Sequence, residues 1–135
     1  MKPDRAVFDT NFFVSLIISK RLDELVIWAK DEHVDIYICQ ELSDELENVL
    51  NRKHIKQHLD ESVTSYIKFI KTVTITATID KRFDRAPDLK DNYLFDLAYT
   101  VKSFYIVTND KPLLNMKQVN KIKLISPADF RKKFK

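Results

Sequence analysis

Short apolar runs typical of buried strands alternate with amphipathic helical patterns along almost the whole chain, and this alternation constrains the fold more than any other feature. The sequence predicts strands at residues 5–9, 34–39, 73–79, 104–108 and 123–125. It predicts helices at residues 11–19, 22–30, 41–51, 54–70, 92–102 and 111–116, and a last one from Pro127. Repeated alternation of this kind favours a mainly parallel sheet with helices on both faces. We therefore expect an α/β fold, a three-layer α/β/α sandwich, in which residues 1–135 form a single domain.

The chain of 135 residues contains no glycine. A P-loop, a dinucleotide-binding fingerprint and a nucleophile elbow all need glycine where the backbone turns tightly. Enzymes built on these motifs are therefore excluded. Where the backbone must be left-handed, we expect asparagine or aspartate to replace glycine, because their short polar side chains tolerate that conformation. The candidates are Asn92, Asn109, Asn115 and Asn120.

The composition is that of a soluble globular protein, with 44% hydrophobic and 32% charged residues. The longest apolar run, residues 12–18, is much shorter than the roughly 20 residues that cross a bilayer. The N-terminus lacks the apolar segment of a secretory signal. We expect a cytoplasmic protein with no membrane partner. The single cysteine, Cys39, is interpreted as a small buried residue at the end of a strand.

Carboxylates stand directly after two of the predicted buried strands. Asp9 follows the first strand, and Asp110 follows the strand that ends near residue 108. The carboxyl ends of parallel strands meet at one edge of the sheet, where ligands bind near the point at which the strand order reverses. Crowded carboxylates repel one another unless a cation or a proton relieves the charge. The sequence therefore predicts a divalent-metal site at this edge.

Further acidic residues lie on two of the predicted helices. Asp91 precedes the helix at 92–102 and can either cap it or point into the crevice. Asp96 is five residues farther along, which does not place both side chains on one helical stripe, so the two share a metal only if Asp91 sits at a frayed helix start. The helix at 41–51 adds several carboxylates, most of which we expect on the solvated surface. They are Glu41, Asp44, Glu45 and Glu47.

The chain is mildly basic, with a net charge of +3. Its basic residues cluster at 52–56, 81–85 and 131–135. Such clusters usually serve solubility alone, but beside a cationic catalytic centre they would contact phosphates.

Four sequence blocks, in order and at the right spacing, resemble the PIN domain nucleases, and particularly the toxin components of toxin–antitoxin systems. The resemblance covers nearly the whole chain. It differs at Asn109, where the family commonly has glycine and where asparagine can adopt the same left-handed turn. The blocks are Val7-Phe8-Asp9-Thr10-Asn11, residues 43–50, residues 88–98, and residues 106–110 with Leu113-Leu114.

The resemblance implies a site, a cofactor and partners. Its catalytic acids would be Asp9, Glu45, Asp91 and Asp110. Mg²⁺ or Mn²⁺ would be bound by Asp9, Asp91 and Asp110, with Asp96 as an additional acid, and Asn11 and Thr108 would support these carboxylates. The implied activity is metal-dependent endoribonuclease cleavage of single-stranded or looped RNA. The implied protein partners are a cognate antitoxin and a second copy in a homodimer.

Other patterns carry less weight. His54 and His58 are spaced like helical zinc ligands, but no acid lies between them and no third ligand is evident. Asp9-Thr10-Asn11 superficially resembles an aspartyl-phosphate loop, yet Asn11 stands where the second aspartate of that loop belongs. The alternative to a nuclease is a catalytically silent PIN-like module that binds RNA or a protein. The full set of acids favours the nuclease.

Overall fold

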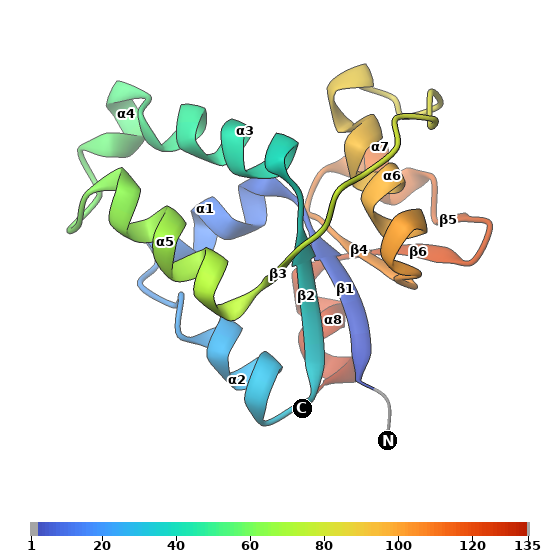
Figure 1. Ribbon diagram of the computed structural model, residues 1–135, viewed down its shortest axis with the longest axis horizontal. Helices are drawn as coiled ribbons and strands as arrows, with labels where there is room; N and C mark the ends of the chain where they lie inside the picture. The colour runs from blue at the N-terminus through green and yellow to red at the C-terminus, as the bar shows by residue number, and fades with distance from the viewer. Residues whose placement is uncertain (1–2, 135) are drawn as a thin grey trace.

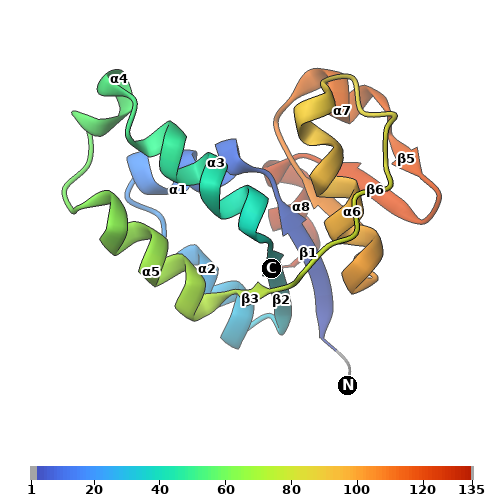
Figure 2. The same ribbon diagram turned by 45° about the horizontal axis from the view of Figure 1, so that its top comes forward.

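A central sheet of six strands is covered by helices on both faces (Figures 1 and 2). The computed structural model describes residues 3–134. The strands are β1 (Asp4–Phe8), β2 (Val34–Ile38), β3 (Ile75–Thr76), β4 (Tyr105–Val107), β5 (Gln118–Val119) and β6 (Ile122–Ile125). The helices are α1 (Thr10–Ile18), α2 (Glu24–Lys30), α3 (Gln40–Leu50), α4 (Lys53–Lys56), α5 (Val63–Val73), the 3₁₀ turn η1 (Leu89–Asp91), α6 (Asn92–Val101), α7 (Lys111–Asn115) and α8 (Pro127–Lys133). The predicted three-layer α/β/α sandwich is confirmed.

The strand order is β3-β2-β1-β4-β6-β5, and every neighbouring pair is parallel except β5 with β6. The chain therefore builds outward from β1 to β2 and β3, and then returns to the other side of β1 to place β4. The strand order reverses between β1 and β4. In an open α/β sheet, this reversal leaves a crevice at the carboxyl ends of the two strands.

An aromatic cluster fixes the carboxyl end of β1. Phe8 is fully buried, and its ring centroid lies 4.8 Å from that of Phe12, 5.4 Å from Trp28 and 5.5 Å from Phe130. These partners come from α1, α2 and α8, while α6 packs against β1 and β4 on the opposite side of the sheet (Figure 1). Burying an aromatic side chain of this size stabilises the fold by about 1.5–3 kcal/mol. The cluster therefore holds the end of β1 and the start of α1 in one place.

The prediction of a single helix over residues 54–70 is wrong. The short helix α4 ends at Lys56, and α5 begins only at Val63. The Ser62 hydroxyl accepts a hydrogen bond from the backbone N–H of Ser65 at 3.1 Å and thereby caps α5. The apolar spacing continues across the break, so periodicity alone could not reveal it.

The third predicted strand is much shorter than expected. α5 runs on to Val73, and only Ile75–Thr76 pairs with β2. The strand β5, which the sequence analysis did not predict, is a two-residue edge piece that pairs with β6. Residues 80–88 contain no helix or strand, and η1 follows at Leu89.

The residues that replace glycine in left-handed turns are mostly lysines, so the prediction for asparagine is wrong at Asn92, Asn109 and Asn115. Of the four candidates, only Asn120 has a positive φ, at 53°. The other positive values within residues 3–134 belong to Lys20, His33, Lys102 and Lys117. Lys20, Lys102 and Lys117 lie at or just after the ends of α1, α6 and α7, where a cation interacts favourably with the helix dipole.

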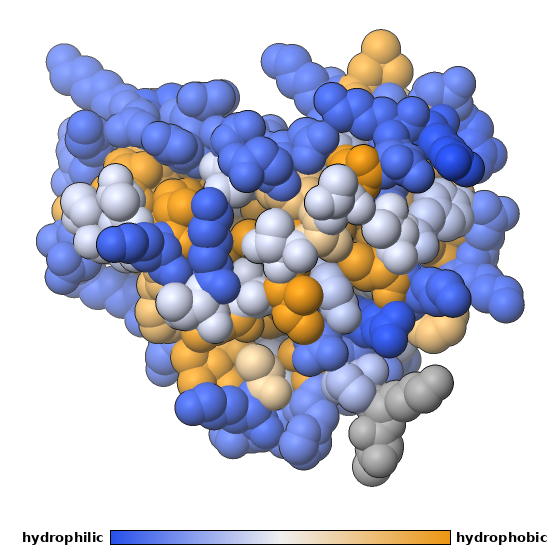
Figure 3. Space-filling view, viewed as in Figure 1, coloured by the Kyte–Doolittle hydropathy of each residue, from blue (hydrophilic) through white to orange (hydrophobic). Residues whose placement is uncertain are grey.

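The surface in Figure 3 shows apolar side chains gathered over α5 and β3 within a largely hydrophilic rim. Phe69 of α5 and Ile75 of β3 are 37% and 43% exposed. Exposed apolar residues that lie together are typical of interaction surfaces. None of the helices described in residues 3–134 has the length and apolarity needed to cross a membrane.

The left-handed cap of α6 gives a test of the glycine-free turns. Lys102 has φ 58° and ψ 43°, and its backbone N–H closes the last turn on Ala98 and Tyr99. Replacing Lys102 by glycine should raise the free energy of unfolding by about 1 kcal/mol, because glycine removes the Cβ clash of left-handed backbone. Chemical denaturation measures this change.

A matched control is Lys68→Gly, at an exposed position within α5. In a helix interior, glycine should lower the free energy of unfolding by about 1 kcal/mol. Destabilisation by both substitutions would contradict the assigned left-handed cap.

Candidate active site

Asp9 and Asp110 stand at the point where the strand order reverses. Each follows its strand and caps the next helix: Asp9 Oδ1 accepts the N–H of Phe12 at 2.9 Å, and Asp110 Oδ2 accepts the N–H of Leu113 at 3.2 Å. A capping side chain is held in the first turn of its helix. The cap geometry therefore fixes both carboxylates at the carboxyl edge of the sheet.

Thr108 joins these two acidic positions. Its hydroxyl donates to Asp9 Oδ2 at 2.5 Å and accepts the backbone N–H of Asp110 at 3.0 Å. Thr108 itself is completely buried. The predicted supporting role of Thr108 thus matches its contacts, which tie the end of β4 to the carboxylate that follows β1.

Glu45 of α3 is held by side chains from two other helices. Thr10 of α1 donates to Glu45 Oε2 at 2.7 Å, and the Tyr93 hydroxyl of α6 donates to the same oxygen. The two hydroxyls lie 3.0 Å apart. Burial and the hydrogen bond to Glu45 raise the pKa of Tyr93 above its usual range, so this hydroxyl remains a proton donor at neutral pH.

Asp91 ends η1 and immediately precedes α6. The sequence left two roles open for it, as a helix cap or as a site residue. Its side chain makes no capping hydrogen bond to α6. The carboxylate of Asp91 is half-buried and therefore free to face the other acids.

Two of the carboxylates at this edge, Asp9 and Asp91, have raised pKa values. Burial, followed by repulsion from Asp110 and Glu45, raises the pKa of Asp9 to about 6, although hydrogen bonds from Thr108 and Phe12 oppose the rise. Burial also raises the pKa of Asp91 to about 6, with further contributions from Asp88, Glu45, Asp110 and Asp9. Mutual repulsion of this kind acts between carboxylates that lie near one another. The predicted quartet is therefore gathered into one acidic cluster of Asp9, Glu45, Asp91 and Asp110.

Asp96 and Asn11 do not join this cluster. Asp96 is 5% exposed, and its Oδ1 accepts the backbone N–H groups of Arg82 and Phe83. It is not among the charges that contribute most to the raised pKa values of Asp9 and Asp91. Asn11 is exposed on the first turn of α1, and no hydrogen bond joins its side chain to the acidic cluster in the described part of the chain.

A groove of about 770 Å³ opens beside the acidic cluster, between α3, the segment before η1 and the start of α6. Of the acidic cluster, Glu45 lines this groove. The lining contains both acidic and basic side chains: the other acids are Glu41, Asp44, Asp84 and Asp96. Four basic side chains also line it. They are Arg52, Lys81, Arg82 and Lys90, from the first two basic clusters of the sequence and the residue next to Asp91.

One member of the third basic cluster, Arg131, packs against the core. Arg131 of α8 donates to both carboxylate oxygens of Glu24, at 3.0 and 3.3 Å. Its guanidinium also lies over the rings of Phe12 and Trp28. This cation is used for packing α8 on α1 and α2.

The family model of the PIN domain matches residues 5–112, which is most of the chain. The chain belongs to the PIN domain family. The matched region contains every member of the acidic cluster, from Asp9 to Asp110. PIN domains are a nuclease family.

The PIN fold also appears in the comparison with solved structures. The chain is similar to the crystal structure of VapBC2 from Rickettsia felis bound to a DNA fragment from their promoter. The TM-score is 0.61 at 15% sequence identity, and the match covers 90% of this chain and 98% of the other. At this identity, the similarity establishes the fold. No curated protein sequence matches the chain.

The acidic cluster of this PIN domain suits a hard divalent cation in its donor chemistry. Carboxylate oxygens are the ligands that Mg²⁺ and Mn²⁺ prefer, and the raised pKa values of Asp9 and Asp91 show charge that a cation would relieve. Within residues 3–134, no group of three or more His, Cys, Asp or Glu side chains is arranged at metal-ligand spacing. The cluster is thus electrostatically prepared for a cation without being arranged to coordinate it.

Thr10 and Tyr93 are the residues of the PIN site that sequence reasoning missed. Thr10 directly follows Asp9, and its hydroxyl bonds to Glu45, 35 residues away in sequence. Tyr93 lies on the helix that follows Asp91, and its residue type alone does not indicate a site, because an aromatic residue on an apolar helix face is usually part of the core. Both are adjacent or nearly adjacent to an acid of the quartet, and this proximity was the only signal available.

The raised pKa of Asp91 predicts a specific pH dependence for Asp91→Asn in metal-free buffer. The pKa is higher in the fold, about 6 against 3.8, so ionisation of Asp91 costs stability as the pH rises from 4 to 6. The amide removes this cost. The variant should match the wild type near pH 4 and exceed its free energy of unfolding by about 1 kcal/mol above pH 7, after allowance for solvent screening.

Urea unfolding at pH 4 and pH 7.5, with EDTA present, measures the two differences. Asp23→Asn is the control, since Asp23 is exposed at the start of α2, far in sequence from the cluster acids, and its side chain makes no cap hydrogen bond. A stability gain for Asp91→Asn that is the same at both pH values would count against the crowded cluster.

Proposed function

We propose that this PIN domain is a metal-dependent endoribonuclease and the toxin component of a toxin–antitoxin system. The observation that carries the proposal is the cluster of four carboxylates at the strand-order reversal, with two pKa values raised to about 6. Without a cation, a cluster of carboxylates of this kind destabilises the fold. A function in catalysis would explain why the protein contains such a cluster.

Asp9, Asp91 and Asp110 would hold Mg²⁺ or Mn²⁺. A divalent cation there supplies charge neutralisation at the phosphoryl oxygens and lowers the pKa of bound water. Thr108 keeps Asp9 ionised and oriented by donating to it, and the cap bond of Asp110 fixes that carboxylate on α7.

Glu45 is suited to orient the attacking water or to accept its proton. One of its carboxylate oxygens receives two hydroxyl donors, from Thr10 and Tyr93. The other oxygen has no such partner among the described residues and is available to a water in the groove. The hydroxyls hold the carboxylate in one orientation, which is what a general base requires.

Single-stranded or looped RNA is the proposed substrate. The groove is open and lined by Arg52, Lys81, Arg82 and Lys90, which suits a flexible phosphate backbone that must bend toward recessed acids. A stacked duplex presents its phosphates on a stiff cylinder and enters such a groove less easily.

A cognate antitoxin protein is the proposed partner. The similarity of the fold to VapBC2 supports this assignment, and so does the exposed apolar surface over α5 and β3. A protein that covers the groove would keep the enzyme inactive until it is released.

The direct test of activity is cleavage of a labelled, mixed-sequence single-stranded RNA by the purified protein with Mg²⁺ or Mn²⁺. Asp110→Asn should lower the rate by about 100-fold or more, because removal of a carboxylate at a metal centre costs several kcal/mol of transition-state stabilisation. EDTA should abolish cleavage, and Asp23→Asn should cut at the wild-type rate.

Folded wild-type protein, free of any bound inhibitor, that binds the RNA without cutting it would instead favour the silent binding module. Thermal unfolding of each variant, measured beside the assay, separates lost chemistry from lost structure.

Metal binding itself gives a second prediction, independent of any RNA. Mn²⁺ should raise the melting temperature of the wild type by several degrees, since a ligand that binds only the folded state stabilises it by linkage. The rise should be clearly smaller for Asp9→Asn, which loses a proposed ligand, and unchanged for Asp23→Asn. Equal shifts in the wild type and Asp9→Asn would exclude a metal shared at Asp9.

A further inference from the structure

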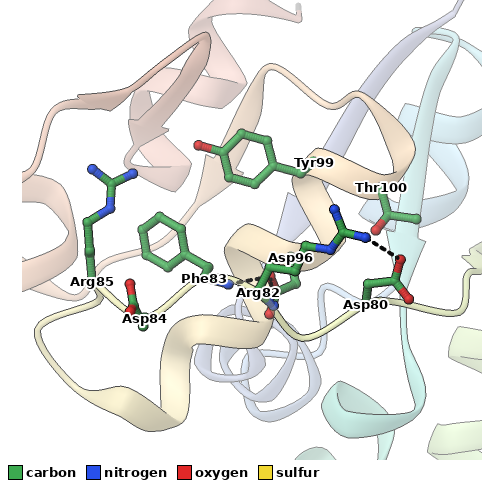
Figure 4. Close-up of a pocket in the computed structure, with 8 residues that line it drawn as sticks. All are labelled: Asp80, Arg82, Phe83, Asp84, Arg85, Asp96, Tyr99 and Thr100. Atoms are coloured by element: carbon green, nitrogen blue, oxygen red, sulfur yellow. Dashed lines mark hydrogen bonds and ion pairs between the residues drawn. The ribbon is translucent and has the colours of Figure 1, made fainter.

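The segment of residues 80–90 lacks regular secondary structure up to the start of η1, yet it is fixed to α6 by a buried carboxylate. Asp96 Oδ1 accepts the backbone N–H of Arg82 at 3.0 Å and that of Phe83 at 2.8 Å. Figure 4 shows Asp96 directed at this part of the segment. Burying a carboxylate is costly unless it is hydrogen-bonded, so a side chain that is only 5% exposed needs both donors.

Two further contacts hold the same segment against α6. The Phe83 ring stacks on Phe95, with centroids 4.2 Å apart and planes 12° from parallel. Asn92 Oδ1 accepts the backbone N–H of Ala86 at 3.0 Å. Side chains of α6 therefore hold this irregular segment at three points, and a loop positioned on a rigid element in this way is a common place for binding residues.

The fixed segment forms the wall of the groove opposite α3. Lys81 and Arg82 both line the groove, and their side chains are 77% and 84% exposed. Each has only a long ion pair, Lys81 with Glu41 and Arg82 with Asp80, both at 3.7 Å. Exposed pairs of this kind contribute less than about 1 kcal/mol, so a phosphate can replace either carboxylate at little cost.

We propose that Asp96 is a positioning residue, which holds the 80–90 segment so that Lys81 and Arg82 bind the phosphates of a single-stranded RNA in the groove. This inference rests on the proposed function and adds the element that binds its substrate. Asp96 acts here as an acceptor for backbone N–H groups. The metal-ligand role that the sequence predicts for it is the alternative that the test must exclude.

A positioning role and a metal-ligand role for Asp96 predict opposite effects of the substitution Asp96→Asn. Asparagine keeps an Oδ1 acceptor in the same position, so Asp96→Asn should preserve the two hydrogen bonds to the segment. Alanine removes the acceptor and should release the segment. A metal ligand, in contrast, would need the charge, and both substitutions would then damage the chemical step.

The kinetic test uses the full chain, Mn²⁺ and the labelled single-stranded RNA. Asp96→Ala should raise KM by about fivefold or more with kcat within about threefold of the wild type, and Arg82→Ala should do the same. Asp96→Asn should stay within about threefold of the wild type in both constants. Equal loss of kcat in Asp96→Asn and Asp96→Ala would overturn the proposal in favour of a metal ligand.

Limited trypsin digestion of the free protein tests the anchoring without RNA or metal. Lys81, Arg82 and Arg85 are cleavage sites within the segment. Asp96→Ala should be cut there about tenfold faster than the wild type, Asp96→Asn at nearly the wild-type rate, and Asp23→Ala at the wild-type rate. Unchanged cleavage of Asp96→Ala would show that the carboxylate does not hold the segment and would overturn the proposal.

If the wild type cuts no RNA, the proposed nuclease function is wrong, but the role of Asp96 can still be tested by measuring RNA binding. Fluorescence anisotropy with the same RNA should then show affinity reduced about fivefold in Asp96→Ala and retained in Asp96→Asn. Equal RNA affinity in the wild type and Asp96→Ala would refute the proposal that Asp96 positions the 80–90 segment to bind RNA. The melting temperature of each variant identifies any global unfolding.

Discussion

The parallel pairing of β1 with β4 is the constraint on which the site depends. The two strands are neighbours in space although β4 begins almost 100 residues after β1, and their carboxyl ends deliver Asp9 and Asp110 to the same edge. Thr108 uses its one hydroxyl on both, as a donor to the first carboxylate and as an acceptor for the backbone of the second. A one-residue shift in the register of this pair would separate Thr108 from Asp9 and break the hydrogen bond that joins the two strand ends.

Much of the architecture and the membership of the acidic cluster could be predicted from the sequence. Buried parallel strands appear as continuous apolar runs, and an acid immediately after such a run must lie at the sheet edge. Asp9 and Asp110 were found in this way. Glu45 could be assigned only through the family resemblance, because four carboxylates lie within seven residues of α3 and periodicity does not say which one faces the site.

The predictions that failed depended on contacts between residues distant in sequence or on local hydrogen bonds. The role of Asp96 as an additional acid of the site stays a prediction, although backbone donors from a segment 13 and 14 residues earlier occupy its Oδ1. The helix break before α5 depends on a single serine cap inside an unbroken apolar pattern. Lysine rarely adopts the left-handed backbone conformation that is seen at these helix ends. Its cost, about 1 kcal/mol for each residue, is offset by compact packing elsewhere in the fold.

The hydrogen bonds to Glu45 connect three helices through one carboxylate. Thr10 belongs to α1, Tyr93 to α6 and Glu45 to α3, and α3 also forms one wall of the groove. The width of the groove and the orientation of the acid are therefore set by the same bonds. A displacement of α3 away from α6 would separate Glu45 from the Tyr93 hydroxyl. The orientation of this carboxylate therefore depends on the position of the helix that carries it.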